Sequence, residues 1–369
     1  MNSFTKSIWT VAFLMGFGAS AFAQNKNNPC PPVNCPCPPR FEQGMELCNT
    51  YPAAYNAPAR IDLDGCWWDL DVYASFIYWH VSQESMDLSI PSLSLSDTLE
   101  DPVGLVFQPF DYKPGFKVGI GSELGHDNWI WFAEYTRLHQ TTTFSGTLAS
   151  EFWFLNSWFP PETDVTYLPT TLSSKWKMNF DMVDLDFSRP YYQGTYLTVS
   201  PYGGLRGLWI TQAFSIATNP NTVSVVSTDV RSHCWSVGPL AGVCSNWMVG
   251  SGFRFEGKAS TSLLFTRYTK LAVDEFFSAI ATGGVAISAN AINRDYDVLR
   301  PAMELGLGIG WGTYLNCGKW YIDLSASYDF LHFWGQNMLR YYVVAVEGVS
   351  ITADNLQMHG LTATARVDF

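Results

Sequence analysis

The chain ends in the stretch Leu361-Thr362-Ala363-Thr364-Ala365-Arg366-Val367-Asp368-Phe369, in which apolar and polar residues alternate without a break. Successive side chains of a β-strand point to opposite faces, so this strand has one apolar face and one polar face. Such a strand suits a wall with lipid on one side and water on the other. The C-terminus therefore predicts a membrane β-strand that runs to the last residue.

The same period of two recurs along the chain and predicts ten strands in total. Trp68, Leu70 and Val72 share one face of the first strand, and Asp69 and Asp71 share the other. On the fourth strand the parity flips near Met182, which predicts a β-bulge there because one extra residue exchanges the faces. The nine further segments are Trp68–Tyr78, Phe116–Leu124, Trp129–Thr136, Trp176–Phe187, Leu197–Trp209, Trp235–Val243, Phe253–Phe265, Leu299–Trp311 and Trp320–Tyr328.

The composition agrees with a surface that does not face water. Of 369 residues, 47% are hydrophobic, 16% aromatic and only 15% charged, whereas about a quarter of a soluble chain is charged. A net charge of −12 disfavours a nucleic-acid partner, because phosphate contacts need a basic surface. Beyond the N-terminal region no apolar run reaches the ~18 residues of a helical span. A closed barrel is the other structure that satisfies every backbone group in lipid.

The predicted fold is thus an all-β, transmembrane antiparallel barrel of 10 to 12 strands, an even number that places both termini in the periplasm. Its final Phe369 looks like the assembly signal of bacterial outer-membrane barrels, so outer-membrane lipid and the assembly machinery are the expected partners. Short turns alternate with long connections, as in such barrels. The long connections are expected at 82–113, 139–174, 212–232, 269–295 and 331–356, and they leave room for additional hairpins.

The N-terminus predicts a secretory signal peptide over residues 1–23. A single basic residue, Lys6, precedes the apolar run Ile8–Phe17, and an Ala-x-Ala end predicts cleavage after Ala23. Residues 24–65 are rich in Pro and Cys and predict an extended periplasmic arm, because Pro cannot join a helix interior or a sheet ladder. The barrel is expected over 66–369.

The cysteines favour disulfides over a metal cluster. An oxidising periplasm promotes disulfides, and the arm lacks C-x-x-C pairs and histidines. The pairing is open: within the chain, to another copy of it, or to other cysteine-rich envelope proteins. The candidates are Cys30, Cys35, Cys37, Cys48, Cys66, Cys244 and Cys317, while Cys234 is expected at the outer end.

Charged side chains on the polar faces are expected to line the lumen. Acidic and basic members nearly balance, so weak selectivity or pairing into a plug is expected. Barrels of ~8 strands are filled and open channels have ~16–18, so ten to twelve strands leave a narrow pore at most, widened by inward glycines such as Gly119 and Gly308. The predicted pore-lining residues are Asp69, Asp71, Lys117, Glu123, Glu134, Lys175, Lys177, Asp181, Arg206, Arg254, Glu256, Lys258, Arg300, Glu304, Asp323, Asp329 and Arg366.

No enzyme, cofactor or metal site is expected. Five of the six histidines fall at outer strand ends and point outward around the circumference, where they cannot converge. Sequence motifs for a nucleophilic serine, a zinc protease or a phosphate loop are absent.

Several motifs resemble the Legionella-type pore-forming major outer membrane protein family, which also has members in chlamydia-like bacteria. They are Asp111-Tyr112-Lys113-Pro114-Gly115-Phe116, His126-Asp127-Asn128-Trp129, Arg189-Pro190-Tyr191-Tyr192, Pro201-Tyr202-Gly203-Gly204 and Gly238-Pro239-Leu240-Ala241-Gly242. The resemblance implies a barrel over roughly 66–369 and a porin-like role. Two hypotheses stand: a pore for the passive diffusion of small polar solutes or ions, or a structural, disulfide-linked envelope protein with a closed lumen.

Overall fold

The computed structural model of the protein describes residues 70–92, 106–124, 129–147, 153–156, 158, 171–194, 196–218, 224–279, 287–293, 295–315, 320–340 and 353–369. All of them belong to the second of two compact units, residues 40–369. The predicted signal peptide and arm lie outside the described residues. Within the described residues, no helix is long and apolar enough to cross a membrane.

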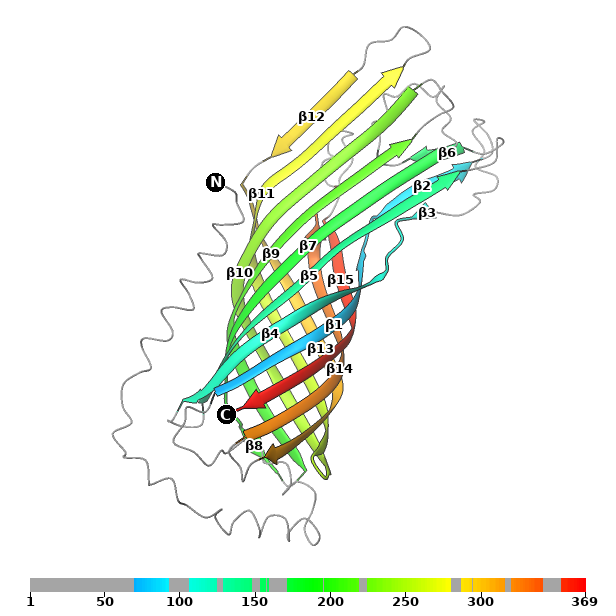
Figure 1. The fold of residues 1–369 in the computed structure, drawn as a ribbon. Helices are drawn as coiled ribbons and strands as arrows, with labels where there is room; N and C mark the ends of the chain where they lie inside the picture. The colour runs from blue at the N-terminus through cyan, green and yellow to red at the C-terminus, as the bar shows by residue number, and fades with distance from the viewer. Residues whose placement is uncertain are drawn as a thin grey trace, which may run out of the picture. The chain divides into compact units, whose positions relative to one another are not determined.

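Ten antiparallel strands close into one barrel (Figure 1), which confirms the predicted fold class. The ring closes where the last strand pairs with the first, Asp368 opposite Asp71, and where β9 pairs with β10. In ring order the strands are β1 (Leu70–Gln83), β4 (Tyr112–Leu124), β5 (Trp129–Thr147), β7 (Thr171–Ser188), β9 (Leu197–Thr218), β10 (Ser224–Gly250), β11 (Phe253–Ala279), β13 (Tyr296–Leu315), β14 (Trp320–Asn337) and β15 (Asp354–Asp368).

Five short strands accompany the barrel. β2 (Asp87–Ser92) pairs with β3 (Val106–Phe107) and β6 (Trp153–Asn156) in a small separate sheet. β12 (Ile287–Asn293) extends the sheet beside β11, and β8 (Tyr192–Gln193) pairs with the beginning of β9.

The two ends of the barrel differ. At one end, here called the turn end, the backbones of Leu70 and Phe369 exchange hydrogen bonds of 3.0 Å, and β10 turns into β11 through two residues, 251 and 252. At the other, the loop end, the strands are joined by the longer connections. Both ends of the described barrel, Leu70 and Phe369, therefore lie at the same rim.

The strands are far longer than the sequence pattern predicted. A tilted strand needs ~9–11 residues to cross a membrane, but β10 and β11 have 27 residues each. The segment 212–232, predicted as a connection, is mostly strand, because β9 continues to Thr218 and β10 begins at Ser224. The predicted limits of the long connections were wrong, since the barrel wall continues past the apolar zone.

An apolar belt covers the outside of the turn-end half. Exposed side chains of this belt include Leu185 on β7, Leu205 on β9 and Leu307 on β13, which is 74% exposed. Further along the same strands the outward side chains become polar. The outward polar residues that mark the upper limit of the belt are His80, Arg137, Asp181, Thr211, His233, Arg267, Asp297 and His359.

The inside of the barrel has the opposite arrangement. Its turn-end half carries charged side chains, and its loop-end half contains a core of buried apolar residues, among them Trp79, Trp176 and Phe180 with no exposed surface. Burial alternates along β7 without interruption from Leu172 to Asp184. Neither neighbouring strand shows a register shift against β7. The predicted β-bulge near Met182 is therefore wrong.

The same finding corrects three predicted lumen residues. Lys175, Lys177 and Asp181 lie on the outward face of β7, because Trp176, Phe180 and the other even-numbered residues point inward. The prediction assumed that the apolar face always meets lipid. On the loop-end side of the belt, the outside of the barrel is polar and the inside is apolar. In this part of a strand, the apolar face is therefore the inward face.

Candidate functional site

The remaining predicted lumen residues within the described range lie on the inward face of the strands, and Asp69 lies outside that range. They alternate in burial with the exposed belt residues beside them. Together with Asp184, Asp186 and Asp368, these inward charged residues are Asp71, Lys117, Glu123, Glu134, Arg206, Arg254, Glu256, Lys258, Arg300, Glu304, Asp323, Asp329 and Arg366. Whether they line a pore depends on how they fill the space.

Glu304 on β13 is the centre of a buried ion-pair network. Its carboxylate accepts a hydrogen bond of 2.7 Å from Arg206 on β9 and one of 3.0 Å from Lys258 on β11. Arg206 donates two more hydrogen bonds, of 2.8 and 2.7 Å, to Asp184 on β7. Strands β9 and β13 are separated by β10 and β11 in the ring. The Arg206–Glu304 contact therefore cuts across the lumen rather than following its wall.

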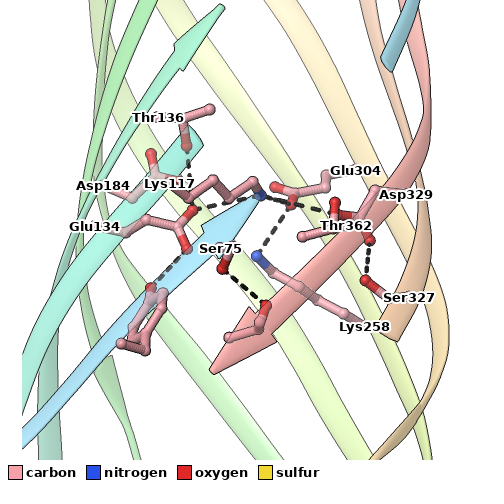
Figure 2. Close-up of polar contacts among 12 residues, drawn as sticks. Ser75, Lys117, Glu134, Thr136, Asp184, Lys258, Glu304, Ser327, Asp329 and Thr362 are labelled. Atoms are coloured by element: carbon pink, nitrogen blue, oxygen red, sulfur yellow. Dashed lines mark hydrogen bonds and ion pairs between the residues drawn. The ribbon is translucent and has the colours of Figure 1, made fainter. Parts of the chain in front are cut away.

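Lys117 on β4 completes the crossing from the other side (Figure 2). Its ammonium group lies 3.6 Å from Glu134, 3.8 Å from Glu304 and 3.9 Å from Asp329. It also lies 5.0 Å from the centre of the Trp79 ring, within cation–π range. Since β4 and β13 are far apart in the ring, Lys117 links opposite walls.

Neutral side chains hold these carboxylates in place. Tyr73 donates a hydrogen bond of 2.6 Å to Glu134. Thr362 donates one of 2.6 Å to Asp329, and in turn accepts one of 3.1 Å from the Trp79 indole. A buried charge is tolerated only where it is paired and hydrogen-bonded. The network fulfils both conditions.

A second ionic group lies closer to the turn end. Arg366 on β15 donates hydrogen bonds of 2.8 Å to Asp71 and 2.7 Å to Asp368. These two aspartates are paired with each other across β1 and β15, the strands that close the ring. Arg254 on β11 pairs with Asp323 on β14, two strands away, at 2.5 and 2.9 Å. This group also bridges non-neighbouring strands.

Solvent reaches the lumen from the turn end and stops at Glu304. The side chains of Glu256 and Lys258 are 25% and 33% exposed. One step further toward the loop end, Arg206 and Glu304 are 1% and 2% exposed. The wet part of the lumen is therefore a vestibule that ends at the network.

Beyond the network, apolar side chains meet across the barrel. The rings of Phe180 on β7 and Phe333 on β14 are 5.8 Å apart, although these strands are not neighbours. Trp158, which follows β6, is fully buried against Phe214 with 4.4 Å between ring centres. Residues from the connections close this core at the loop end: Met86, Leu88, Gln108, Met338 and Leu339 are all nearly inaccessible.

The inward glycines do not widen the lumen as predicted. A Cβ atom at Gly119 would lie 2.2 Å from the Tyr73 ring, and one at Gly306 would lie 2.8 Å from the Asp329 carboxylate. At Gly310 it would lie 2.6 Å from Glu256. Each glycine makes room for a large neighbour, so it permits dense packing instead of open space.

The cysteines and histidines show two differences from expectation. Both cysteines in the described part, Cys234 and the disulfide candidate Cys244, are free thiols; the other six lie outside it. The five histidines within the described part point outward as predicted, but they are not all separated: the rings of His80 and His359 are 5.0 Å apart. No cluster of three metal-ligating side chains occurs among the described residues.

Sequence reasoning missed the neutral part of the network. Trp79 follows the predicted segment Trp68–Tyr78 and was not among the predicted lumen residues, although its indole donates a hydrogen bond to Thr362, which in turn donates one to Asp329. Asp184 was placed on the polar face that the supposed bulge created, and it was not included among the lumen residues.

The family model of the Legionella pneumophila major outer membrane protein precursor matches residues 67–369. The chain belongs to this family. It is thus an integral outer-membrane β-barrel protein. No curated protein matches its sequence.

Among solved structures, the chain is similar to the outer membrane protease OmpT of Escherichia coli, with 10% identity, a TM-score of 0.36 and coverage of 82% of this chain and 96% of that one. The Pseudomonas putida toluene transporter TodX gives 9% identity, a TM-score of 0.24 and coverages of 88% and 93%. For the attachment invasion locus protein Ail of Yersinia pestis the values are 8%, 0.16, 81% and 98%.

Proposed function

We propose that this family member is a structural protein of the outer membrane whose lumen is closed at rest. The observation that carries the proposal is the row of ion pairs from Lys117 through Glu304 to Arg206, which crosses the lumen between opposite walls of the barrel. These three side chains are at most 5% exposed. Behind it lies the apolar core around Phe180 and Phe333. A hydrated ion would have to cross an ionic barrier and then a dry one.

The strand count supports the same conclusion. Barrels of about eight strands are filled by side chains, and aqueous channels are known at about 16–18. Ten strands place this protein near the filled class, and the bulky residues Trp79 and Trp176 occupy the remaining space. Passive diffusion, the role implied by the resemblance, therefore receives no support from the lumen.

Planar lipid bilayers test the proposal directly. Purified protein is expected to insert without discrete conductance steps at low voltage. A steady open channel under these conditions would overturn the closed resting state. Insertion itself is checked on the same preparation by the resistance of the folded barrel to protease, so that silence is not confused with a failure to insert.

A gated pore is the second candidate, and a specific feature favours it. Part of the closure comes from the connections at the loop end: Met86 and Leu88 follow β1, and Met338 and Leu339 follow β14. These segments can move without breaking the ladder of the barrel. Reversible steps that appear only at raised voltage, and that disappear when the two segments are cross-linked, would support gating over a purely structural role.

We also propose that the turn end faces the periplasm and the loop end faces outward. Short turns of outer-membrane barrels face the periplasm and long loops face outward, and the turn end is the one where β10 turns into β11 through two residues. A membrane-impermeant thiol reagent on whole cells tests this with two exposed positions. Ser145→Cys at the loop end is expected to react, and Arg189→Cys at the turn end is not.

A further inference from the structure

Outward cations gather on one side of the barrel, just beyond the apolar belt. Lys177 lies four residues past Asp181 on β7, and Arg231 lies two residues past His233 on β10. Lys270 follows on β11. We name these three side chains the basic band. The same outward face carries Asp229 on β10 and Asp274 on β11 beside Arg231, so the excess positive charge of the band comes from Lys177 and Lys270.

The strand register brings the three cations together. Lys177 is opposite Ala213 on β9, and Ala213 is opposite Arg231 on β10. His233 is opposite Lys270 on β11. Neighbouring strands are about 4.8 Å apart, so the band spans roughly 10 to 15 Å. The small side chain of Ala213 leaves the space between Lys177 and Arg231 open.

Most of the positive charge in the band is unused. Within the described part of the chain, Lys177 and Lys270 form no ion pair, and Arg231 has one pair of 3.6 Å with Asp274. Two histidines, His139 and His233, lie at the same level on β5 and β10. The strands across the ring differ. Just past the belt, the outward positions of β1, β14 and β15 are occupied by His80, His332 and His359. Among the described residues, these positions include no Lys or Arg.

The tryptophans fix the depth of the band. Trp209 on β9 and Trp235 on β10 are the last outward aromatic residues before it, and Trp209 is 39% exposed. Trp side chains prefer the level of lipid headgroups at a membrane interface. The next outward positions are Thr211 and His233, and Lys270 of the basic band is paired with His233, so we expect the band to lie at the level of the headgroup phosphates.

We propose that the outward face of β7, β9, β10 and β11 binds the phosphate groups of an outer-leaflet glycolipid that carries phosphates on its sugars. Arg and Lys are the side chains that bind phosphate by charge-assisted hydrogen bonds. Several cations at this spacing suit a headgroup with more than one phosphate better than a single free ion. The choice of leaflet depends on the orientation given under the proposed function, whereas binding in detergent does not.

Native mass spectrometry of the full-length protein in detergent tests this with diphosphoryl lipid A as the probe. The wild-type protein is expected to retain it, and K177Q/R231Q/K270Q is expected to bind about 10-fold or more weakly, since charged hydrogen bonds are lost. The charge-conserving variant K177R/R231K/K270R should restore binding. Equal binding by wild type and the Gln variant would overturn the proposal.

Further arms separate the sources of phosphate. Dephosphorylated lipid A is expected to bind poorly, and equal retention of it would show that acyl chains alone make the contact and overturn the proposal. Inorganic phosphate at moderate concentration should not displace the glycolipid, and phosphatidylglycerol should bind less well; the opposite results would overturn the glycolipid as occupant.

K177Q is compared with R189Q, which removes one charge at the turn end and should bind like wild type. The three replaced side chains are outside the lumen, so folding and conductance should be unchanged.

Discussion

The turn-end and loop-end halves of the barrel use the same strands in opposite ways. In the turn-end half, apolar side chains such as Leu185 face outward and ion pairs such as Arg206–Glu304 fill the inside. In the loop-end half, Phe180 and Trp176 fill the inside, and charged residues such as Lys177 face outward. The backbone pairing between neighbouring strands is the same in both halves. The medium around the barrel, lipid or water, therefore determines which face of a strand is apolar. On strand β7 the outward face changes from apolar to polar between Val183 and Asp181, and we expect lipid to end there.

The reversal also explains how a narrow barrel remains closed. In the loop-end half water surrounds the wall, and the inside forms a core as in a soluble protein. In the turn-end half lipid covers the outside, and the polar inward residues can only satisfy each other. The lumen thus contains an ion-pair network in its turn-end half and an apolar core in its loop-end half. We expect substitutions in the two halves to affect stability differently.

The largest expected effect is at the buried hub. Glu304→Ala leaves Arg206, Lys258 and Lys117 without their shared anion in a site that is 2% exposed. Removing one partner of a buried ion pair typically costs about 3 to 5 kcal/mol, because an uncompensated charge remains. Urea unfolding in detergent micelles, followed by Trp fluorescence, measures the loss. A loss below about 1 kcal/mol, the value typical of exposed pairs, would show that the network is hydrated.

The next effect compares one substitution at two positions on the same face of β7. Leu185→Arg places a charge in the apolar belt, which is expected to cost about 2 to 4 kcal/mol. Ser173→Arg places the same charge on the same face above the belt, where surface changes usually stay within about 0.5 kcal/mol. Unfolding in lipid vesicles gives both values. Equal destabilisation at both sites would mean that lipid also covers the loop-end half.

The sequence predicted the fold well because alternation is local. Each of the ten barrel strands overlaps one of the segments that alternation indicated, from Trp68–Tyr78 to Leu361–Phe369. It predicted their length poorly. Along Trp176-Lys177-Met178-Asn179-Phe180 the alternation is clear, but an apolar face next to lipid and an apolar face in a core have the same pattern. The parity change after Met182 was therefore interpreted as a bulge.

The site was only partly predictable for a different reason. That Lys117, Arg206 and Glu304 point inward follows from alternation on each strand. That they meet depends on the register of every strand pair around the ring, which fixes which residues face each other across the lumen. Arg206 and Glu304 are 98 residues apart, and no local pattern links them. The filling of the lumen is a property of the closed barrel.

The smallest effect is expected for an ion pair on the outside of the loop-end half. Arg267 and Asp297 form two hydrogen bonds of 2.6 and 2.7 Å, a geometry as good as that of Arg206 with Asp184, but both side chains are 39% exposed. Water solvates each partner when the other is removed, so Asp297→Ala should destabilise the barrel far less than Glu304→Ala. The difference should also depend on salt, since ~1 M salt reduces the screening length to about 3 Å. Unfolding of both variants at low and high salt is the measurement: the Asp297→Ala effect should disappear at high salt while the Glu304→Ala effect persists. A loss of stability at Asp297 that resists salt would mean that lipid covers the pair, and that the upper limit of the belt on β13 lies nearer the loop end than Asp297.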